Sequence, residues 1–550
     1  MRVLGVEGTA WCASAAVFDA EADAVFIESD AYRPDSGGIH PREAAEHMGE
    51  AIPQVVETAL EHAREEYGGS SGDTDGDGGS DGDPPVDAVA FSRGPGLGPC
   101  LRIVATAARA LARTLDVPLV GVNHMVAHLE IGRHRAGFDS PVCLNASGAN
   151  AHLLGYHDGR YRVLGETMDT GVGNALDKFT RHVGWSHPGG PKIEAHAADG
   201  EFVELPYVVK GMDFSFSGIM SAAKAAYDDG VPVDDVCFSL QEHVFAMLTE
   251  VSERALSLTG TDELVLGGGV GQNARLREML AEMCAERGAE FHAPEPRFLR
   301  DNAGMIAVLG ARMAADDDTV AVEDSAIDPD FRPDEVPVTW RDGEASVARV
   351  PDAGEAEPRG AEATVELDGD DAVKRRLPKG YRHPDLDATL RRDRTVSEAR
   401  LLAAGRKAGV PTPLVRDVDV PAATVTMQRV GECDLAAALT ADAARTVGEL
   451  LAKLHAAGVV HGDPTTRNVR VGDDGPDGGS RLFLVDFGLG FDSDHVEDYA
   501  MDLHVFEQSV EGTATEPERL VEAVEAGYRS VGDPAVVERL RGVEGRGRYQ

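Results

Sequence analysis

Two histidines spaced one helical turn apart are the residues of this chain with the plainest capacity for chemistry. His124 and His128 lie in NHMVAHLE, a stretch that the sequence predicts to be helical. Residues four apart share one face of a helix, so both imidazoles can reach one metal ion. The alternative is a pair of helical histidines that cap or hydrogen-bond without a metal.

A third ligand could come from Asp301, which precedes the apolar helix predicted within DNAGMIAVLGARMAA. Two imidazoles and a carboxylate suit iron(II) or zinc and leave coordination positions open for a substrate oxygen. The alternative role of Asp301 is to cap the helix. A metallopeptidase is the competing enzyme class, but a zincin helix has a glutamate, its general base, directly after the first histidine, and Met125 stands there.

Two loops rich in small residues could contact a nucleotide. Residues 147–150 lie between two predicted strands and could aim backbone N–H groups at a phosphate, although most such turns are plain hairpins. Glycines 267–269 follow an apolar strand and precede a helix that carries Asn273 near its start. An adenine nucleotide can lie against such backbone, and a simple tight connection is the alternative.

The most specific motif lies in the second half of the chain. HGDPTTRN places Asp463 and Asn468 five positions apart, as are the catalytic aspartate and the metal-binding asparagine of the protein-kinase catalytic loop. LVDFG follows at the expected distance, and Asp486 of its Asp-Phe-Gly would hold Mg²⁺ against ATP phosphates. The two motifs together predict a kinase-like fold.

Lys374 and Glu398 would form the lysine–glutamate pair of that fold. Lys374 lies near the end of a predicted strand and Glu398 on a predicted helix, where it could instead complete a capping box with Thr395. No G-x-G-x-x-G precedes the lysine, and no Ala-Pro-Glu follows the Asp-Phe-Gly. The sequence therefore predicts a minimal, atypical kinase-like α+β domain.

The elements that must position these residues follow from length and pattern. At 550 residues the chain exceeds what one hydrophobic core usually supports, so two or more domains are expected. Alternating strands and helices predict an α/β domain over residues 1–325, interrupted at 68–85 by a glycine- and aspartate-rich loop that we expect to be disordered. Residues 326–357 read as a linker, and residues 358–550 as the kinase-like domain.

The formal net charge of −43 is spread over the whole chain, as in proteins of halophiles that keep molar salt in the cell. At molar salt the Debye length is about 3 Å, so this charge does not exclude a nucleic-acid partner. Six scattered cysteines without a C-x-x-C predict reduced thiols. No long apolar run and no signal-peptide pattern are present, so we expect a cytoplasmic protein without membrane contact.

Ten motifs follow one another in the first half: EGTA, GGIHPREAAEHM, SRGPGLGPCLR, NHMVAHLE, SGAN, NALDKF, HPGGPKIE, FSFSG, GGGVGQN and DNAGMIA. With these motifs in this order, residues 1–325 resemble the tRNA threonylcarbamoyladenosine synthase family, the catalytic subunit of the archaeal KEOPS complex. The resemblance implies a two-lobed, actin-like ATPase fold. It also implies that His124, His128 and Asp301 hold the metal. Where the family usually has a tyrosine, drawn as a fourth ligand, this chain has Asn145, so water or the amide would take that place.

The same resemblance implies a substrate and a reaction. The metal would orient threonylcarbamoyl-AMP, whose threonylcarbamoyl group passes to the exocyclic amine of the adenosine 3′ of the anticodon in tRNAs that read codons beginning with adenine. The implied partners are tRNA, the adenylate, and two further KEOPS subunits, a small dimerising one and a kinase-binding one. The implied adenylate contacts are Ser147, Gly148, Ala149, Asn150, Asp177, Gly190, Glu194 and Asn273.

The second half resembles the small atypical serine/threonine kinase of KEOPS over residues 358–550, through GAEA, YRHPDLD, RTVSEARLL and HGDPTTRN. Pro464 and Arg467 depart from the family's usual HGDLTTSN. The resemblance implies that Lys374, Asn468 and Asp486 bind ATP and Mg²⁺. ATP hydrolysis coupled to tRNA modification is expected, and a protein kinase or a non-catalytic ATP-sensing module is the alternative. We interpret the chain as a natural fusion of the two subunits, which keeps them at high effective concentration.

Overall fold

The structure of the chain is a computed structural model that describes residues 1–32, 40–67, 84–148, 150–157, 159–341, 360–472, 481–514 and 516–544. Residues 68–83 of the loop expected to be disordered lie outside the described residues. Among those that are described, no helix has the length and apolar character needed to span a membrane. We refer to residues 1–341 as the first half and to residues 360–544 as the second half.

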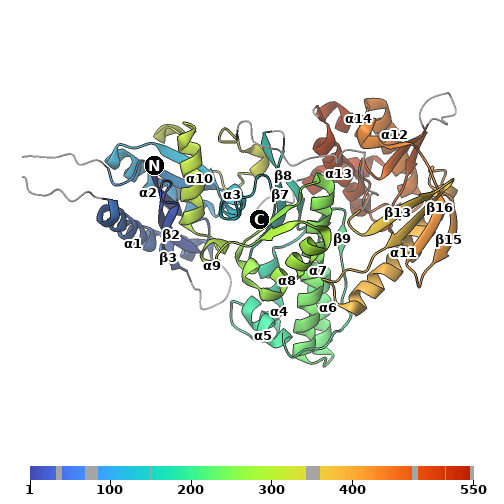
Figure 1. The fold of residues 1–550 in the computed structure, drawn as a ribbon, viewed down its shortest axis with the longest axis horizontal. Coiled ribbons are helices and arrows are strands. Elements are labelled where there is room, and N and C mark those ends of the chain that lie inside the picture. Colours follow the sequence, from blue (N-terminus) through green and yellow to red (C-terminus); the bar gives the residue numbers. More distant parts are fainter. Residues whose placement is uncertain are drawn as a thin grey trace, which may run out of the picture.

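Two five-stranded sheets with one strand order organise the first half (Figure 1). In each sheet the first three strands are antiparallel neighbours, and the fourth and fifth run parallel to the first. The strands of the first sheet are β1 (Arg2–Glu7), β2 (Cys12–Asp19), β3 (Ala24–Ala31), β4 (Ala88–Gly94) and β5 (Leu119–Asn123). Those of the second are β6 (Val142–Ala146), β7 (Ala151–His157), β8 (Arg160–Glu166), β11 (Glu263–Gly267) and β12 (Glu290–His292).

Helices cover both faces of each sheet, and the order of the layers positions the candidate metal ligands. Apolar residues of α1 (Pro41–Tyr67) and α2 (Gly98–Leu115) cover the outer face of the first sheet. Two helices, α3 (His124–Ala136) and α10 (Ala303–Ala315), contribute to one core with both sheets, and Figure 1 shows them between the sheets. The predicted histidine helix therefore lies at the centre of the first half.

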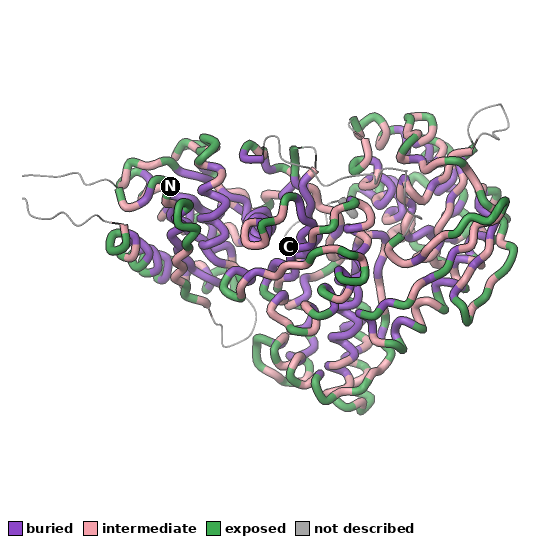
Figure 2. The backbone as a smooth tube through the Cα atoms, in the orientation of Figure 1, coloured by how far each residue is buried: buried purple, intermediate pink, exposed green. Residues whose placement is uncertain are grey.

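The outer face of the second sheet carries the largest apolar core of the first half. Its helices are α4 (Val172–His182), α5 (Gly190–Ala197), α6 (Ser217–Asp228), α7 (Val233–Thr259) and α8 (Ala274–Arg287), with the short α9 (Pro296–Leu299) and the hairpin β9 (Val209–Lys210) and β10 (Asp213–Phe214) beside them. Figure 2 shows buried residues along both sheets and along α7. Because α7 is buried almost throughout, it must pack against more than one neighbour.

A glycine lets the first sheet and α10 approach closely. A Cβ atom on Gly5 of β1 would lie 2.4 Å from the carbonyl oxygen of Ala303 and 2.8 Å from the backbone nitrogen of Ala307. Real Cβ atoms do not tolerate such contacts, so only glycine permits this packing. The contact brings the start of α10, and with it Asp301, against the strand that ends at Glu7.

The second half combines a four-stranded antiparallel sheet and a group of helices. The sheet has the order β13 (Ala363–Asp368), β14 (Asp371–Arg376), β16 (Thr424–Gln428) and β15 (Val415–Asp419), with α11 (Pro384–Lys407) against it. The other helices are α12 (Ala441–Ala456), α13 (Val496–Thr513), α14 (Glu518–Val531) and α15 (Pro534–Glu544). Short strands lie between the two groups: β17 (Cys433–Asp434), β18 (Val459–Val460), β19 (Val469–Gly472), β20 (Arg481–Leu484) and β21 (Phe491–Asp492).

The linker predicted at residues 326–357 is wrong for its first part. Val336 and Trp340 are buried in the core around α3 and α10. Arg341 has no exposed side-chain surface, and its guanidinium lies 3.3 Å from Glu130 Oε1 and donates to the carbonyl of Asp139. Composition misled because a segment without periodicity can still be fixed by one buried ion pair and a few apolar anchors. Residues 342–357 lie outside the described part of the chain.

Candidate active site

His124, His128 and Asp301 converge between the two sheets. The Nε2 atoms of both histidines lie 3.3 Å from Asp301 Oδ1, and the three potential ligand atoms all lie within 4.8 Å of one another. Both imidazoles are buried, and the carboxylate is partly exposed. Among the described residues this is the one cluster of at least three histidine, cysteine or acidic side chains that could hold an ion.

Asparagines cap α3, which carries both histidines, and α10, which begins two residues after Asp301. The side chain of Asn123 accepts hydrogen bonds from the backbone of Met125 and Val126, so α3 begins with His124 directly after β5. The side chain of Asn302 accepts from the backbone of Met305 and caps α10. The alternative role of Asp301 as an N-cap is therefore wrong, because Asn302 performs it and leaves the Asp301 carboxylate directed at the histidines.

Two further residues, which sequence reasoning did not single out, hold the ligands in place. Glu7, fully buried at the end of β1, lies 3.2 Å from His124 Nδ1, and Trp11 Nε1 donates to Asp301 Oδ2 over 2.9 Å. Partners of this kind fix the tautomer and orientation of metal ligands. Trp11 directly follows the EGTA motif in the sequence. Only the β1–β2 turn places Glu7 and Trp11 beside residues from elsewhere in the chain.

The charges around the histidines favour a cation. Burial alone lowers the pKa of His124, but the carboxylates of Glu7 and Asp301 raise it to about 10. Burial raises the pKa of Asp301, yet the neighbouring His124 and His128 outweigh this and hold that pKa well below its ordinary value. The buried carboxylate of Glu7 and the partly exposed one of Asp301 thus face two imidazoles, and this donor set fits a divalent iron or zinc ion.

Asn145 occupies the side of the second sheet that faces α3. Along β6 it alternates with Leu144 and shares a face with Cys143, which packs in the core with α3. Its Oδ1 atom is buried and accepts no hydrogen bond from any residue that the structure describes, and its amide nitrogen lies 3.5 Å from Nε2 of His152 on β7. Burial and the nearby His128 and His124 lower the pKa of His152 to about 3, so that ring stays neutral. That the amide of Asn145 or water takes the place of the tyrosine stays a prediction.

The small-residue turn packs against the start of α4. The backbone of Ser147 and that of Gly148 accept hydrogen bonds from Gly173 and Asn174, so the turn is fixed to the helix N-terminus. Ala149 lies outside the described residues. The turn is therefore more than a free hairpin.

The remaining predicted adenylate residues lie on α4 and α5 and at the start of α8. The carboxylate of Asp177 accepts from the backbone of Gly189, next to Gly190 at the start of α5. Glu194 accepts from the backbone nitrogen of Ala274, the residue after Asn273. The Asn273 side chain itself caps α8. These side chains hold α4, α5 and α8 together around one edge of the second sheet.

A second polar cluster forms where the kinase-like motifs meet. Lys374 Nζ lies 2.9 Å from Glu398 and 2.7 Å from Asp486, and all three side chains come from different elements. Glu398 lies in the interior of α11, which His383 caps, so the capping-box alternative with Thr395 is wrong. Burial raises the pKa of Asp486, but Lys374 outweighs it and lowers that pKa well below its ordinary value.

The catalytic-loop residues lie beside the first half. Asn468 donates to both the backbone carbonyl and the carboxylate of Asp463. Arg254 of α7 lies 3.2 Å from the same carboxylate, and Arg467 donates to the carbonyl of Ser257 on that helix. Burial raises the pKa of Asp463 to about 6, although Arg254 opposes this. Arg467, a departure from the family motif, thus contacts the first half.

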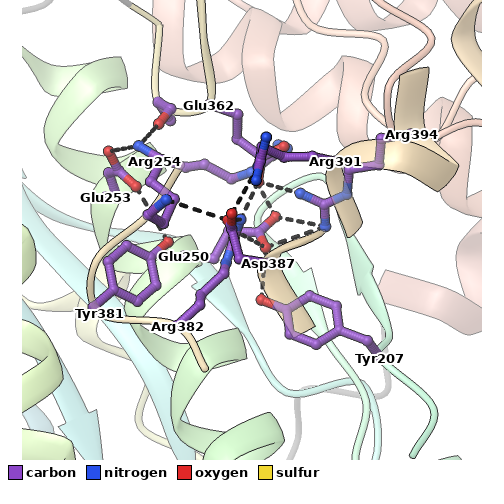
Figure 3. Close-up of polar contacts among 12 residues, drawn as sticks. Tyr207, Glu250, Glu253, Arg254, Glu362, Tyr381, Arg382, Asp387, Arg391 and Arg394 are labelled. Carbon is purple, nitrogen blue, oxygen red and sulfur yellow. Dashed lines mark hydrogen bonds and ion pairs between the residues drawn. The ribbon is translucent and has the colours of Figure 1, made fainter. Parts of the chain in front are cut away.

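Ion pairs join the halves around Glu250 of α7 (Figure 3). Its fully buried carboxylate lies 2.8 Å from Arg382 and 3.1 Å from Arg394 of the second half, and accepts from Tyr207 of the first. Figure 3 shows the guanidinium groups gathered around the acidic side chains. Glu253 of α7 pairs with Lys379 across the same contact. Within the second half, Glu362 pairs with Arg382 and Arg394. The long buried helix α7, which was not among the elements predicted from the sequence, therefore forms a contact between the two halves.

Comparison with known proteins identifies the family of the chain. The family model described as tRNA N6-adenosine threonylcarbamoyltransferase matches residues 23–308. A probable bifunctional tRNA threonylcarbamoyladenosine biosynthesis protein of Halobacterium salinarum is 69% identical, over 100% of this chain and 99% of its own. A protein of the same description from Methanospirillum hungatei is 49% identical over 100% of this chain and 99% of its own. Full-length HypF, solved with phosphate and nucleotide bound, is 13% identical at a TM-score of 0.40, over 57% of this chain and 55% of that one. The chain belongs to the family of bifunctional tRNA threonylcarbamoyladenosine biosynthesis proteins and is a tRNA-modifying enzyme.

Proposed function

We propose that the first half transfers the threonylcarbamoyl group of threonylcarbamoyl-AMP to the exocyclic amine of the adenosine 3′ of the anticodon, in tRNAs that read codons beginning with adenine. The observation that carries the proposal is the convergence of His124, His128 and Asp301 within 4.8 Å in a member of this family. In the transfer the amine nitrogen bonds to the carbamoyl carbon, the bond from that carbon to the phosphate oxygen breaks, and the amine proton leaves with AMP or passes to water.

The three ligands would hold one iron(II) or zinc ion. When bound, the ion supplies Lewis-acid polarisation and neutralises charge near the acyl phosphate. Glu7 accepts the Nδ1 proton of His124 and so directs Nε2 at the ion position. Trp11 engages one oxygen of Asp301 and leaves the other toward the histidines.

The adenylate would lie on the second-sheet side of these ligands. The phosphate would lie against the turn 147–150, where the carbonyls of Ser147 and Gly148 accept hydrogen bonds from the start of α4. Asp177, Gly190, Glu194 and Asn273 would contact the nucleoside, and their mutual contacts through Gly189 and Ala274 support a preformed site. Binding the adenylate and the amine in fixed orientation is the main contribution of these residues to the rate.

For the second half we propose an atypical kinase-like ATPase. Lys374, Asn468 and Asp486 would bind ATP and Mg²⁺, with Glu398 orienting Lys374 and Asp463 as the catalytic aspartate. The ion pairs of Lys374 with Glu398 and Asp486 support this assignment. The contact of Arg254 with Asp463 supports direct action of one half on the other. The alternatives are a serine/threonine kinase and a non-catalytic ATP-sensing module. Asp486→Asn separates a catalytic from a sensing second half. If this variant supports tRNA modification at full rate without hydrolysing ATP, only the sensing role is left.

We further propose that the first half, predicted as residues 1–325 and extended by the packed segment up to Arg341, forms an actin-like, two-lobed domain, since both sheets have one strand order and topology. Residues 358–550 would form the kinase-like domain. The proposed partners are tRNA and the dimerising and kinase-binding subunits of KEOPS, and the proposed location is the cytoplasm.

The test is a reconstituted modification assay. Full chain, tRNA, threonine, bicarbonate, ATP and the enzyme that makes the adenylate are combined in molar salt with the other KEOPS subunits, and the modified nucleoside is measured by mass spectrometry. We expect His128→Ala to abolish the product and bound iron or zinc, with His495→Ala, an exposed histidine of the second half, as the control. Unchanged product formation by the His128 variant would disprove the metal assignment.

A further inference from the structure

One of the three tryptophans is not packed in any core. Trp185 stacks on His196 and packs against the core around α4 to α8, and Trp340 is buried in the core around α3 and α10. Trp11 is only partly buried and, among the described residues, belongs to none of the four apolar clusters and forms no ring contact. A large apolar side chain that the core does not use requires another explanation.

The indole of Trp11 is held at one edge. Its Nε1 donates to Asp301 Oδ2 over 2.9 Å. The backbone of its turn is fixed at several points: Thr9 donates to Glu7, the carbonyl of Thr9 accepts from Leu97, and the carbonyl of Trp11 accepts from Tyr32. The edge of the ring therefore has a defined position beside the candidate metal ligands, and in the described part of the chain the ring belongs to none of the four apolar clusters.

We propose that Trp11 is the platform on which the target adenine stacks. The inference rests on the proposed transfer function and adds the residue that receives the acceptor base. Enzymes that act on a base take it out of the nucleic-acid stack and hold it on aromatic side chains. An indole whose edge touches a metal ligand brings a stacked adenine, and so its exocyclic amine, next to the reacting carbon.

The position of Trp11 suits the acceptor and not the adenylate. Trp11 lies in the β1–β2 turn of the first sheet, whereas the proposed adenylate residues lie on α4, α5 and α8 at the second sheet. The two substrates would thus approach the ion from opposite lobes, with the base on one side and the acyl phosphate on the other. This arrangement leaves the carbamoyl carbon between them.

A nearby cation fits an RNA backbone. Arg300, next to Asp301 in the chain, is exposed and forms no ion pair with any described residue. A phosphate of the anticodon loop would neutralise this exposed guanidinium. Arg300 would supply a contact with the RNA backbone, which base stacking alone does not provide.

The test is a double-mutant cycle on binding. The RNAs are an anticodon stem-loop with adenosine 3′ of the anticodon and the same stem-loop with an abasic site there. Each is titrated against the full chain and against Trp11→Ala and Trp11→Phe in molar KCl. Stacking on an aromatic side chain is expected to make the unchanged chain bind the intact RNA about tenfold to a hundredfold tighter than the abasic RNA.

We expect Trp11→Ala to bind both RNAs within about threefold of each other, and Trp11→Phe to retain most of the discrimination, because phenylalanine keeps the aromatic face and loses only the N–H. Discrimination by Trp11→Ala equal to that of the unchanged chain overturns the proposal. Equal loss in the two variants also overturns it, since the hydrogen bond to Asp301 would then be the functional contact.

Two further readouts separate this inference from the proposed function. The absorption of bound Co²⁺ in each variant reports whether the ligands remain in place without using activity. If the unchanged chain forms product and Trp11→Ala still discriminates normally between the two RNAs, the transfer function is right and the role of Trp11 as a platform is wrong. Absence of both product and discrimination in the unchanged chain means that the transfer function itself is wrong.

Discussion

Replacing Glu250 by glutamine should loosen the contact between the two halves. The Glu250 side chain is fully buried and faces Arg254, Arg382 and Arg394, whose side chains are 13%, 2% and 10% exposed. Removing one partner of a buried ion pair costs about 3–5 kcal/mol, because the remaining charges stay buried. Here Glu362 still pairs with two of the arginines, so we expect the lower end, about 3 kcal/mol.

The assay uses a hydrogen bond that crosses the contact. The backbone N–H of Gly380 in the second half donates to Glu286 of α8, so hydrogen exchange in the peptide around Gly380 reports separation of the halves. A loss of about 3 kcal/mol corresponds to a separation equilibrium, and hence an exchange rate, more than a hundredfold higher. The measurement is hydrogen-exchange mass spectrometry of the full chain.

Glu278→Gln is the matched control. Glu278 also pairs with an arginine, Arg275 at 2.7 Å, but its side chain is 66% exposed, so the pair is worth at most about 0.5 kcal/mol. Molar salt should cancel even this small effect and leave the effect at Glu250, because only exposed pairs are well screened. Normal protection of the Gly380 peptide in Glu250→Gln would refute the view that buried charge pairs hold the halves together.

Two other substitutions test the site and the core. Glu7→Gln should weaken metal binding about tenfold to a hundredfold by removing the charge beside His124 Nδ1, as measured with a competing chelating dye, and an unchanged affinity would contradict the role of Glu7. Burial raises the pKa of Asp213 from 3.8 to about 7, so its stabilising contribution is complete below about pH 4 and is lost as the pH rises through about 7. The free energy of unfolding of Asp213→Asn should therefore rise relative to that of the unchanged chain by up to about 1.4 kcal/mol per pH unit across that window. Urea unfolding measures this difference, and a difference that does not change with pH would count against the prediction.

The local elements of the site were predictable because each has a local cause. The apolar run before His124 and the spacing of the two histidines predicted β5 and α3, and Asn123 begins the helix at the expected place. The spacing of Asp463, Asn468 and Asp486 likewise predicted a cluster that the structure brings near Lys374. Periodicity and motif spacing act over short stretches, where propensity and capping decide the conformation.

Other expectations failed where a distant residue decides the local role. Asp301 alone resembles a helix cap, and only the presence of Asn302 in that place frees it. Glu398 with Thr395 resembles a capping box, although α11 begins more than ten residues earlier. Arg341 lies in a stretch that composition assigns to a linker, and its burial against Glu130 became visible only in the folded chain.

The sequence by itself determined the family of this protein and the candidate residues: two imidazoles and a carboxylate that could hold an ion, and a kinase-like motif set. The tertiary structure decided which residues work together. It placed Glu7 and Trp11 beside ligands more than a hundred residues away, and it set Arg254 of one half against Asp463 of the other. The physical reason is that ligand strength and charge belong to the residue type, whereas burial, partners and pKa belong to the packing around it.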